Sequence, residues 1–391
     1  MIIRRKYLNL IRPYYNSDDI KILTGVRRCG KSTLLNQIKD EISKDNSNII
    51  FFDFENYDDS AFCSAPVEFY NEIKKRLDKS KKNYVFIDEV HYLDDYERII
   101  PSIRSSLQCS VFITDSSSSL LKGNLATRFT GRSISFLIMP FSFSEFTEIT
   151  GKTGKDALDF YLMHGGMPAQ YSDRENKDFS YLNRLYKSII ERDVVEKNNL
   201  RNKWQFNKIS SYILSHSGET FSSSSISRFI GNDGVSCSIP TINSYCSYIK
   251  EAFLVSECNR FSIKGKQVLQ TFSKYYAIDT GFITIQDKTG NLNLGLLLET
   301  VVYNELIGRG YDVYIGKTYN GEVDFFVKKE NDCRYYQVAY DLTKPETQDR
   351  EFKAFDSIKD NYPKYVISTD TVNYSRNGII HINILDFLTE T

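Results

Sequence analysis

The chain has 391 residues, of which 41% are hydrophobic and 26% charged, and its 50 basic side chains balance its 50 acidic ones. This length predicts two or three domains. The neutral balance excludes wholesale electrostatic binding to nucleic acid or anionic lipid, while leaving a local basic face open. No apolar run approaches a membrane span, the first residues lack a signal peptide, and the seven cysteines are scattered without a C-x-x-C pair. We therefore expect a cytoplasmic protein with free thiols and no membrane partner.

Residues 1–150 alternate short apolar runs with helical stretches, which predicts a three-layer α/β domain with a parallel sheet. The runs are nearly continuous in apolar residues, as is typical of strands buried on both faces. The five predicted strands cover 20–25, 48–55, 83–90, 109–115 and 133–140.

The rest of the chain divides into three further segments. Residues 151–203 are predicted to form a helical linker region. Residues 204–284 have the order helix, Ser-rich turn, short helix, longer helix and two strands, which predicts a winged-helix module with Ser238 and Pro240 at the start of its longer helix. Residues 285–391 open with a helix and continue with strands and helices, which predicts a second, smaller α/β domain.

The stretch "GVRRCGKST" matches the phosphate-binding pattern G-x-x-x-x-G-K-[ST], and it follows a predicted buried strand and precedes a predicted helix. We expect its backbone N–H groups to surround the phosphates of ATP, Lys31 to reach the β- and γ-phosphates, and Ser32 to hold Mg²⁺. The motif does not require Arg27 or Arg28, which we expect to neutralise the outer edge of the nucleotide or to contact a neighbouring module. The predicted nucleotide-binding residues are Gly25, Val26, Arg27, Arg28, Cys29, Gly30, Lys31, Ser32 and Thr33.

The strand "YVFIDEV" ends in an acidic pair, Asp88 and Glu89. A buried acidic pair is costly unless a cation or hydrogen bonds compensate it, although many strands simply end in an acidic turn. Together with the phosphate loop, the pair predicts that Asp88 meets Mg²⁺ through water and that Glu89 polarises the attacking water. Glu89 therefore favours hydrolysis over binding alone.

Two further groups of residues are candidates for sensing or stabilising the phosphates. Thr114, Asp115 and Ser116 end the next strand and could position the water or sense the γ-phosphate, or else cap a helix. Arg128 and Arg132 precede the fifth strand, where an arginine can stabilise phosphate charge in its own or a neighbouring subunit, unless both are ordinary surface residues. Action on a neighbouring subunit would require an oligomer.

Several stretches together resemble one family, the bacterial and archaeal AAA-type ATPases of the AAA+ superfamily that carry a C-terminal domain of unknown function. They are "GVRRCGKSTLL", "FIDEV", "LATRFTGRSISFLIMPFSFSEF", "YLMHGGMPAQY", "SYIKEAFLVSECNRFSIKGKQVL", "KYYAIDTGF" and "YQVAYDL" followed by "ETQDREFKAF". The resemblance covers nearly the whole chain. It implies a P-loop ATPase domain, a winged-helix segment and a tail with a restriction-endonuclease-like fold. Similar sequences have Gly-Ser after the threonine of "FITD", whereas this chain has Asp115 in place of that glycine.

The resemblance also allows the tail to be compared with the catalytic pattern of nucleases. In nucleases of the restriction-endonuclease fold, a helix glutamate, a strand aspartate and an acid-x-lysine strand gather metal and water. Glu299 and Asp324 match the first two, but Gln337 stands for the acid and Ala339 for the lysine. We therefore expect an inactive nuclease fold reused for binding.

Double-stranded DNA is a candidate partner of the winged-helix segment. Its predicted wing carries Arg260, Lys264, Lys266 and Lys274, while the predicted recognition helix, with Thr241, Asn243, Ser244 and Tyr248, is polar without being basic. The alternative is that this module packs against the ATPase domain or binds a protein partner. Altogether the sequence predicts Mg-dependent ATP hydrolysis that regulates the C-terminal modules. The alternatives are a slow nucleotide-gated interaction switch and an ATP-dependent nuclease.

Overall fold

The chain divides into two compact units, residues 1–138 with 251–253 (unit 1) and residues 139–250 with 254–391 (unit 2). No helix in the described part of the chain is long and apolar enough to cross a lipid bilayer. The computed structural model describes residues 2–117, 129, 131–171, 178–220, 222–232, 234–287, 290, 292–319 and 321–390.

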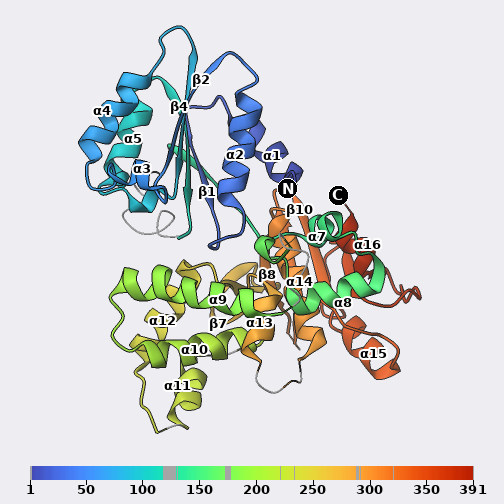
Figure 1. The fold of residues 1–391 in the computed structure, drawn as a ribbon. Coiled ribbons are helices and arrows are strands. Elements are labelled where there is room, and N and C mark those ends of the chain that lie inside the picture. Colours follow the sequence, from blue (N-terminus) through green and yellow to red (C-terminus); the bar gives the residue numbers. More distant parts are fainter. Residues whose placement is uncertain are drawn as a thin grey trace. The chain divides into compact units, whose positions relative to one another are not determined.

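Unit 1 is built on a five-stranded sheet in the order β2-β3-β4-β1-β5, and every neighbouring pair in it is parallel (Figure 1). The parallel α/β domain predicted from the sequence is therefore confirmed. β4 lies between β1 and β3, so the carboxyl ends of these three strands meet at one edge of the sheet. The strands are β1 (Ile20–Thr24), β2 (Ser47–Asp53), β3 (Lys82–Asp88), β4 (Cys109–Asp115) and β5 (Ser133–Leu137).

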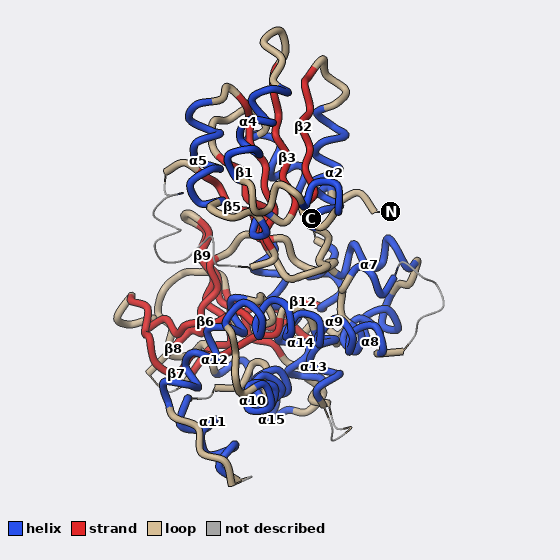
Figure 2. Tube along the Cα trace, turned by 60° about the vertical axis from the view of Figure 1, so that its left-hand side comes forward, coloured by secondary structure: helices blue, strands red, loops and turns tan. Residues whose placement is uncertain are grey.

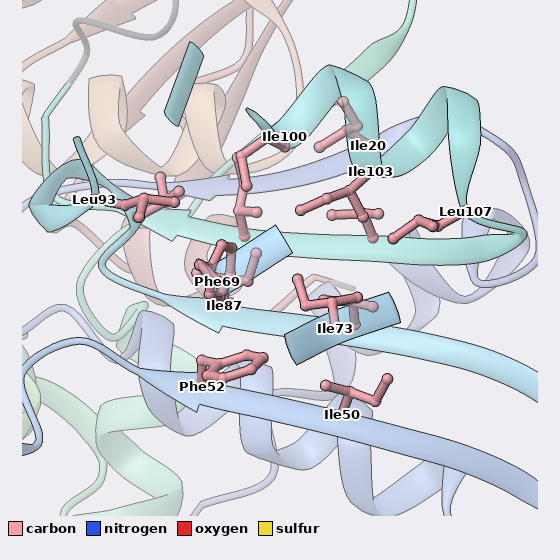
Figure 3. Close-up of a cluster of buried hydrophobic side chains, with 14 of the residues drawn as sticks. Ile20, Ile50, Phe52, Phe69, Ile73, Ile87, Leu93, Ile100, Ile103 and Leu107 are labelled. Carbon is pink, nitrogen blue, oxygen red and sulfur yellow. The ribbon is translucent and has the colours of Figure 1, made fainter. Parts of the chain in front are cut away.

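Helices cover both faces of this sheet, with α2 on one face and α4 and α5 on the other (Figure 1). Under α4 and α5, buried side chains such as Phe52, Phe69 and Ile103 interlock between strands and helices (Figure 3). Burying each such side chain contributes about 1.5–3 kcal/mol. The helices of unit 1 are α1 (Arg5–Ile11), α2 (Lys31–Ile42), α3 (Tyr57–Ser60), α4 (Pro66–Arg76) and α5 (Tyr96–Ser106), with 3₁₀ turns at Arg12–Tyr14 and Val90–Tyr92.

Unit 2 contains a seven-stranded mixed sheet in the order β12-β11-β10-β9-β8-β6-β7. The hairpin β6–β7, predicted as the wing of a separate module, pairs with the tail because β6 runs parallel to β8 with Arg260 opposite Ile315 (Figure 2). One sheet therefore joins the segments predicted as 204–284 and 285–391. Its strands are β6 (Val255–Ser262), β7 (Gln267–Ala277), β8 (Asp312–Lys317), β9 (Glu322–Lys329), β10 (Asp332–Val338), β11 (Lys364–Ser368) and β12 (Ile379–Asn383).

A buried aspartate ties two sequence motifs of unit 2 together. Asp279 caps α13 through the Gly281 N–H and also accepts the Gly166 N–H at 2.6 Å. A Cβ on Gly166 would lie 2.1 Å from the Phe141 carbonyl oxygen, so only glycine fits this approach. The helices of unit 2 are α7 (Phe143–Thr150), α8 (Gly154–His164), α9 (Ser180–Ile189), α10 (Lys203–Ser215), α11 (Ser223–Gly231), α12 (Ile239–Glu251), α13 (Thr280–Gln286), α14 (Leu294–Gly308), α15 (Pro345–Lys353) and α16 (Ile384–Thr389), with a 3₁₀ turn at Pro168–Tyr171 and a π-helical stretch at Ile190–Glu196.

Candidate functional site

The loop between β1 and α2 depends on glycine at both of its ends. Gly25 has a φ of 152°, and a Cβ there would lie 2.3 Å from the Ile138 carbonyl oxygen. Gly30 has a φ of 104° and precedes α2, which begins without a side-chain cap. An uncapped helix N-terminus leaves the N–H groups of its first turn for an anion, and the helix dipole adds positive potential there. Val26 and Cys29 are fully buried, so their side chains serve packing.

Lys31 lies folded over this loop. Its Nζ donates to the carbonyl oxygens of Gly25 at 3.1 Å and Val26 at 3.3 Å, and it lies 3.6 Å from Glu89 Oε1. Burial alone would lower the pKa of Lys31, but the acidic groups around it, Glu89 first among them, together outweigh burial and raise it. Lys31 is therefore a buried ammonium paired with the predicted catalytic acid. Ser32 and Thr33 follow it, half-buried in the first turn of α2.

The acidic pair at the end of β3 is held by a single hydroxyl group from β4. Thr114 Oγ1 donates to Asp88 Oδ1 at 2.5 Å and accepts the Glu89 N–H at 2.8 Å. Glu89 has a φ of 50°, in the left-handed region that non-glycine residues rarely adopt. This strained backbone turns Glu89 away from the strand, and the hydroxyl of Thr114 stabilises it.

The pKa values of Asp88 and Glu89 shift in opposite directions because their surroundings differ. Burial raises the pKa of Asp88, although hydrogen bonds from Thr114 and Ser32 oppose this shift. Burial would also raise the pKa of Glu89, but Lys31, followed by His91, brings it down to about 2. The hydroxyl of Ser32 and the carboxylate of Asp88, already in contact, are the hard oxygen donors that Mg²⁺ prefers. The residues present therefore fit a magnesium ion.

Sequence reasoning missed His91 as a member of this site. Its Nδ1 lies 3.2 Å from Glu89 Oε2 and 3.4 Å from Asp115 Oδ1. Burial would lower the pKa of His91, but the carboxylates of Asp115 and Glu89 raise it to about 9. Asp115 and Ser116, predicted as sensor candidates, are both buried at the end of β4. Only its place two residues after Glu89 could have pointed to His91, since Asp115 is far away in sequence.

The arginines predicted to lie near the nucleotide differ in burial and in pairing. Arg27 is buried and forms an ion pair with Glu55 at 3.1 Å, whereas Arg28 is exposed with a φ of 68°. Arg132 is exposed directly before β5. Arg128 lies outside the described residues.

A second cluster of polar residues lies in unit 2, where the tail was predicted to hold a decayed nuclease site. Glu299, Asp324 and Gln337 line one pocket of about 950 Å³, together with Ala339 and Glu351. The Gln337 amide is engaged at both ends, since it accepts the Asp324 N–H at 3.1 Å and donates to Glu351 Oε2 at 2.7 Å. An acid at this position would lose the second bond, so the amide serves as a structural bridge.

The cation paired with Glu299 comes from β7 and was predicted from the sequence to belong to a DNA-binding wing. Lys274 is buried, and its Nζ donates to Glu299 Oε1 at 2.9 Å. Burial, followed by the charge of Glu299, raises the pKa of Asp324 well above its usual range. Arg260 is likewise occupied by an ion pair with Glu322.

Lys264 and Lys266 are exposed in the turn that joins β6 to β7. On α12, Asn243 and Ser244 are exposed whereas Thr241 and Tyr248 are half-buried. Ser238 Oγ accepts the Thr241 N–H at 3.3 Å at the start of this helix. The exposed basic footprint of the predicted wing is therefore smaller than its sequence suggests.

Comparison with known proteins accounts for nearly the whole chain. It matches, in turn, an AAA domain over residues 17–147, a domain of unknown function (DUF8612) over 155–291 and a further domain of unknown function (DUF4143) over 294–387. An uncharacterized protein of Haemophilus influenzae is 30% identical over 399 aligned positions, which span 100% of this chain and 99% of that protein. The chain belongs to the AAA-type P-loop ATPase family with a C-terminal domain of unknown function. The family predicted from the motifs is thus confirmed.

Three other proteins are similar to this chain at lower sequence identity. An uncharacterized protein of Methanocaldococcus jannaschii is 28% identical over 94% of this chain and 85% of its own. The Walker-type ATPase of Pyrococcus abyssi covers 72% of this chain and 93% of its own, with a TM-score of 0.46 and 16% identity. AMPPCP-bound DnaA from Aquifex aeolicus covers 64% and 90%, with a TM-score of 0.33 and 15% identity.

Proposed function

We propose that unit 1 binds Mg-ATP and hydrolyses it, and that the nucleotide state regulates the C-terminal modules of the chain. The observation that carries this proposal is the anchoring of Glu89, whose backbone N–H is held by Thr114 and whose ionised, buried carboxylate lies 3.6 Å from Lys31. A phosphate loop alone would support binding only. A charged acid held beside the phosphate-loop lysine supports activation of water as well.

The ion pair between Lys31 and Glu89 suggests how binding prepares the base. The phosphates of ATP compete for Lys31, whose ammonium holds the pKa of Glu89 at about 2. Once Lys31 turns to the phosphates, burial raises the pKa of Glu89 again, and a carboxylate with a higher pKa is the stronger base for water. Ser32 and Asp88 would hold Mg²⁺, which supplies neutralisation of phosphate charge.

Two arginines complete the proposal. Arg128 and Arg132 would stabilise charge on the transferred phosphoryl group, in the same subunit or in a neighbouring copy. The exposed side chain of Arg132 supports the second arrangement, which requires an oligomer.

The seven unpaired cysteines support a reducing, cytoplasmic location.

The test compares ATP binding with phosphate release in three variants. Lys31→Ala should lose both activities, because the only buried ammonium described at this loop is removed. Glu89→Gln should keep binding but lose turnover by about 10²–10⁴-fold, the range expected for a general base. Arg28→Ala, whose side chain is exposed, is the matched control for loss of a loop cation and should bind ATP. Wild-type turnover no faster than that of Glu89→Gln would contradict hydrolysis and leave the nucleotide-gated switch.

The partner of the C-terminal modules is tested separately. Lys264 and Lys266 support a weak, salt-dependent contact with duplex DNA, whereas the paired Arg260 and Lys274 favour a protein partner. ATPase rates with and without duplex DNA, at low and moderate salt, distinguish the two. Stimulation that fades with salt supports DNA, and an unchanged rate supports protein.

Nuclease activity is the remaining alternative. We propose that the pocket around Asp324 does not cleave DNA, because the Gln337 amide bridges the Asp324 N–H and the Glu351 carboxylate, and Lys274 neutralises Glu299. Incubation of plasmid and linear DNA with Mg²⁺ or Mn²⁺ should leave both intact. Cutting that disappears in Asp324→Ala would overturn this view.

A further inference from the structure

Three metal-ligating side chains from separate turns of unit 1 converge beside the phosphate loop. Glu89 follows β3, His91 lies in the 3₁₀ turn Val90–Tyr92, and Asp115 ends β4. One donor atom from each lies within 4.8 Å of the other two. The group therefore offers one imidazole nitrogen and two carboxylates around a common point.

Hydrogen bonds within the described part of the chain leave this group incomplete. Glu89 Oε2, Asp115 Oδ2 and His91 Nδ1 are buried atoms without a hydrogen-bond partner there. Glu89 is 6% exposed and Asp115 is fully buried, so neither carboxylate is surrounded by bulk water. A single N–H on Nδ1 cannot point at two carboxylates at once, and it points well at neither. A cation that takes the place of the Nδ1 proton, which is released to solvent, would interact with both carboxylates at once.

Two of the three separations between donors are close to those around a small tetrahedral cation. Zinc–nitrogen and zinc–oxygen bonds of about 2.0–2.2 Å in a tetrahedron place neighbouring donors roughly 3.3–3.6 Å apart. The two separations from His91 Nδ1, to Glu89 Oε2 and to Asp115 Oδ1, are 3.2 and 3.4 Å. Magnesium and calcium prefer oxygen donors alone, whereas a set with an imidazole suits zinc and its divalent transition-metal neighbours.

We propose that Glu89, His91 and Asp115 form a binding site for a divalent transition metal of the zinc type, with a fourth position left for water. The site depends on Asp115 at the end of β4. It is distinct from the magnesium position predicted at Ser32 and Asp88. Metal bound here occupies the Glu89 carboxylate, so it inhibits ATP hydrolysis; this consequence rests on the proposed function, whereas binding itself does not.

The test is titration of the full-length, nucleotide-free protein with Co²⁺ and, by calorimetry, with Zn²⁺. Wild-type protein should bind one equivalent with the visible absorption of four-coordinate Co²⁺ and without thiolate charge-transfer bands, which separates this site from cysteines. Asp115→Asn and His91→Gln should each weaken binding at least about tenfold. Asp53→Asn removes a carboxylate one strand away, at the end of β2, and should bind as wild type does.

Inhibition forms a second, separate measurement. Zn²⁺ should suppress Mg-ATP turnover of the wild-type protein. The turnover of Asp115→Asn should be nearly the same with Zn²⁺ as without it. No stoichiometric uptake of Co²⁺, or equal uptake by wild type and either variant, would overturn the site. Uptake without ATP turnover in any sample would preserve the metal site and refute hydrolysis instead.

Discussion

Replacing Thr114 by Val removes one hydroxyl group from the candidate site while nearly conserving side-chain volume. That hydroxyl donates to Asp88 at 2.5 Å and accepts the Glu89 N–H at 2.8 Å, and Thr114 is fully buried. The substitution leaves a buried donor and a buried acceptor without their partner. It also removes the group that stabilises the left-handed backbone of Glu89.

The expected magnitude follows from these contacts. Each buried polar group left unsatisfied costs about 1–3 kcal/mol, so local stability should fall by roughly 2–4 kcal/mol because the two losses are not additive. Left-handed backbone in a non-glycine residue stores about 1–3 kcal/mol, and relaxing it would move the Glu89 carboxylate. A displacement of about 1 Å at a catalytic group can cost on the order of 10²-fold in rate.

Two measurements check this expectation, ATP turnover and hydrogen exchange of peptides that contain the Glu89 amide. Thr114→Val should lower turnover by about 10²-fold and accelerate exchange of that amide by at least tenfold, the equivalent of about 1.4 kcal/mol. Thr114→Ser is the matched control, because it keeps the hydroxyl and loses only a methyl group. Wild-type turnover together with wild-type protection in Thr114→Val would refute the bridging role.

Three further predictions concern unit 2, whose unfolding can be followed by the fluorescence of the single tryptophan, which lies in this unit. Gly166→Ala should lower the free energy of unfolding by roughly 3 kcal/mol, because its Cβ would lie 2.1 Å from a carbonyl oxygen. Gly231→Ala, with open space around the Cβ, should stay within about 1 kcal/mol of wild type, and equal losses in both variants would contradict the packing argument. Lys274→Met should cost about 3–5 kcal/mol by leaving the buried Glu299 without its counter-ion, although the Tyr276 hydroxyl still donates to it. Adding Glu299→Gln should recover much of that loss, whereas no recovery would contradict the charge argument. Burial raises the pKa of Asp279 to about 7, above an unfolded value near 3.9, so its contribution to stability falls as pH rises from about 4 to 7. Urea unfolding of wild type relative to Asp279→Asn should show a loss of roughly 4 kcal/mol over this interval, and a constant difference would refute the assignment.

The strands of unit 1 could be predicted from the sequence because burial on both faces leaves an unusually clear pattern. Runs such as "YVFIDEV" contain few polar residues before their carboxyl end, where the chain leaves the sheet. The order of the strands could not be predicted, since nothing in the run around Phe112 indicates that β4 lies between β1 and β3.

The same distinction applies to the residues of the site: some belong to local sequence patterns, and others depend on tertiary contacts. Gly25, Lys31 and Glu89 belong to short patterns whose spacing carries the chemistry, so each could be proposed without a structure. His91 and Lys274 act through partners that are distant in the chain or on another strand. A lone histidine and a lysine in a hairpin carry no signal of such partners, and only tertiary structure reveals them.

Pairing of β6 with β8 has a consequence for the order of events during translation. Arg260 and Ile315 are opposite each other in the sheet but lie 55 positions apart in the chain (315 − 260 = 55). A ribosome that adds about 5–20 residues per second needs roughly 3–11 s to deliver the second after the first. Throughout that interval β6 has β7 on one side and a bare edge on the other, the kind of edge that pairs with foreign strands. The β6–β7 hairpin is therefore exposed to pairing with foreign strands until β8 has been synthesised.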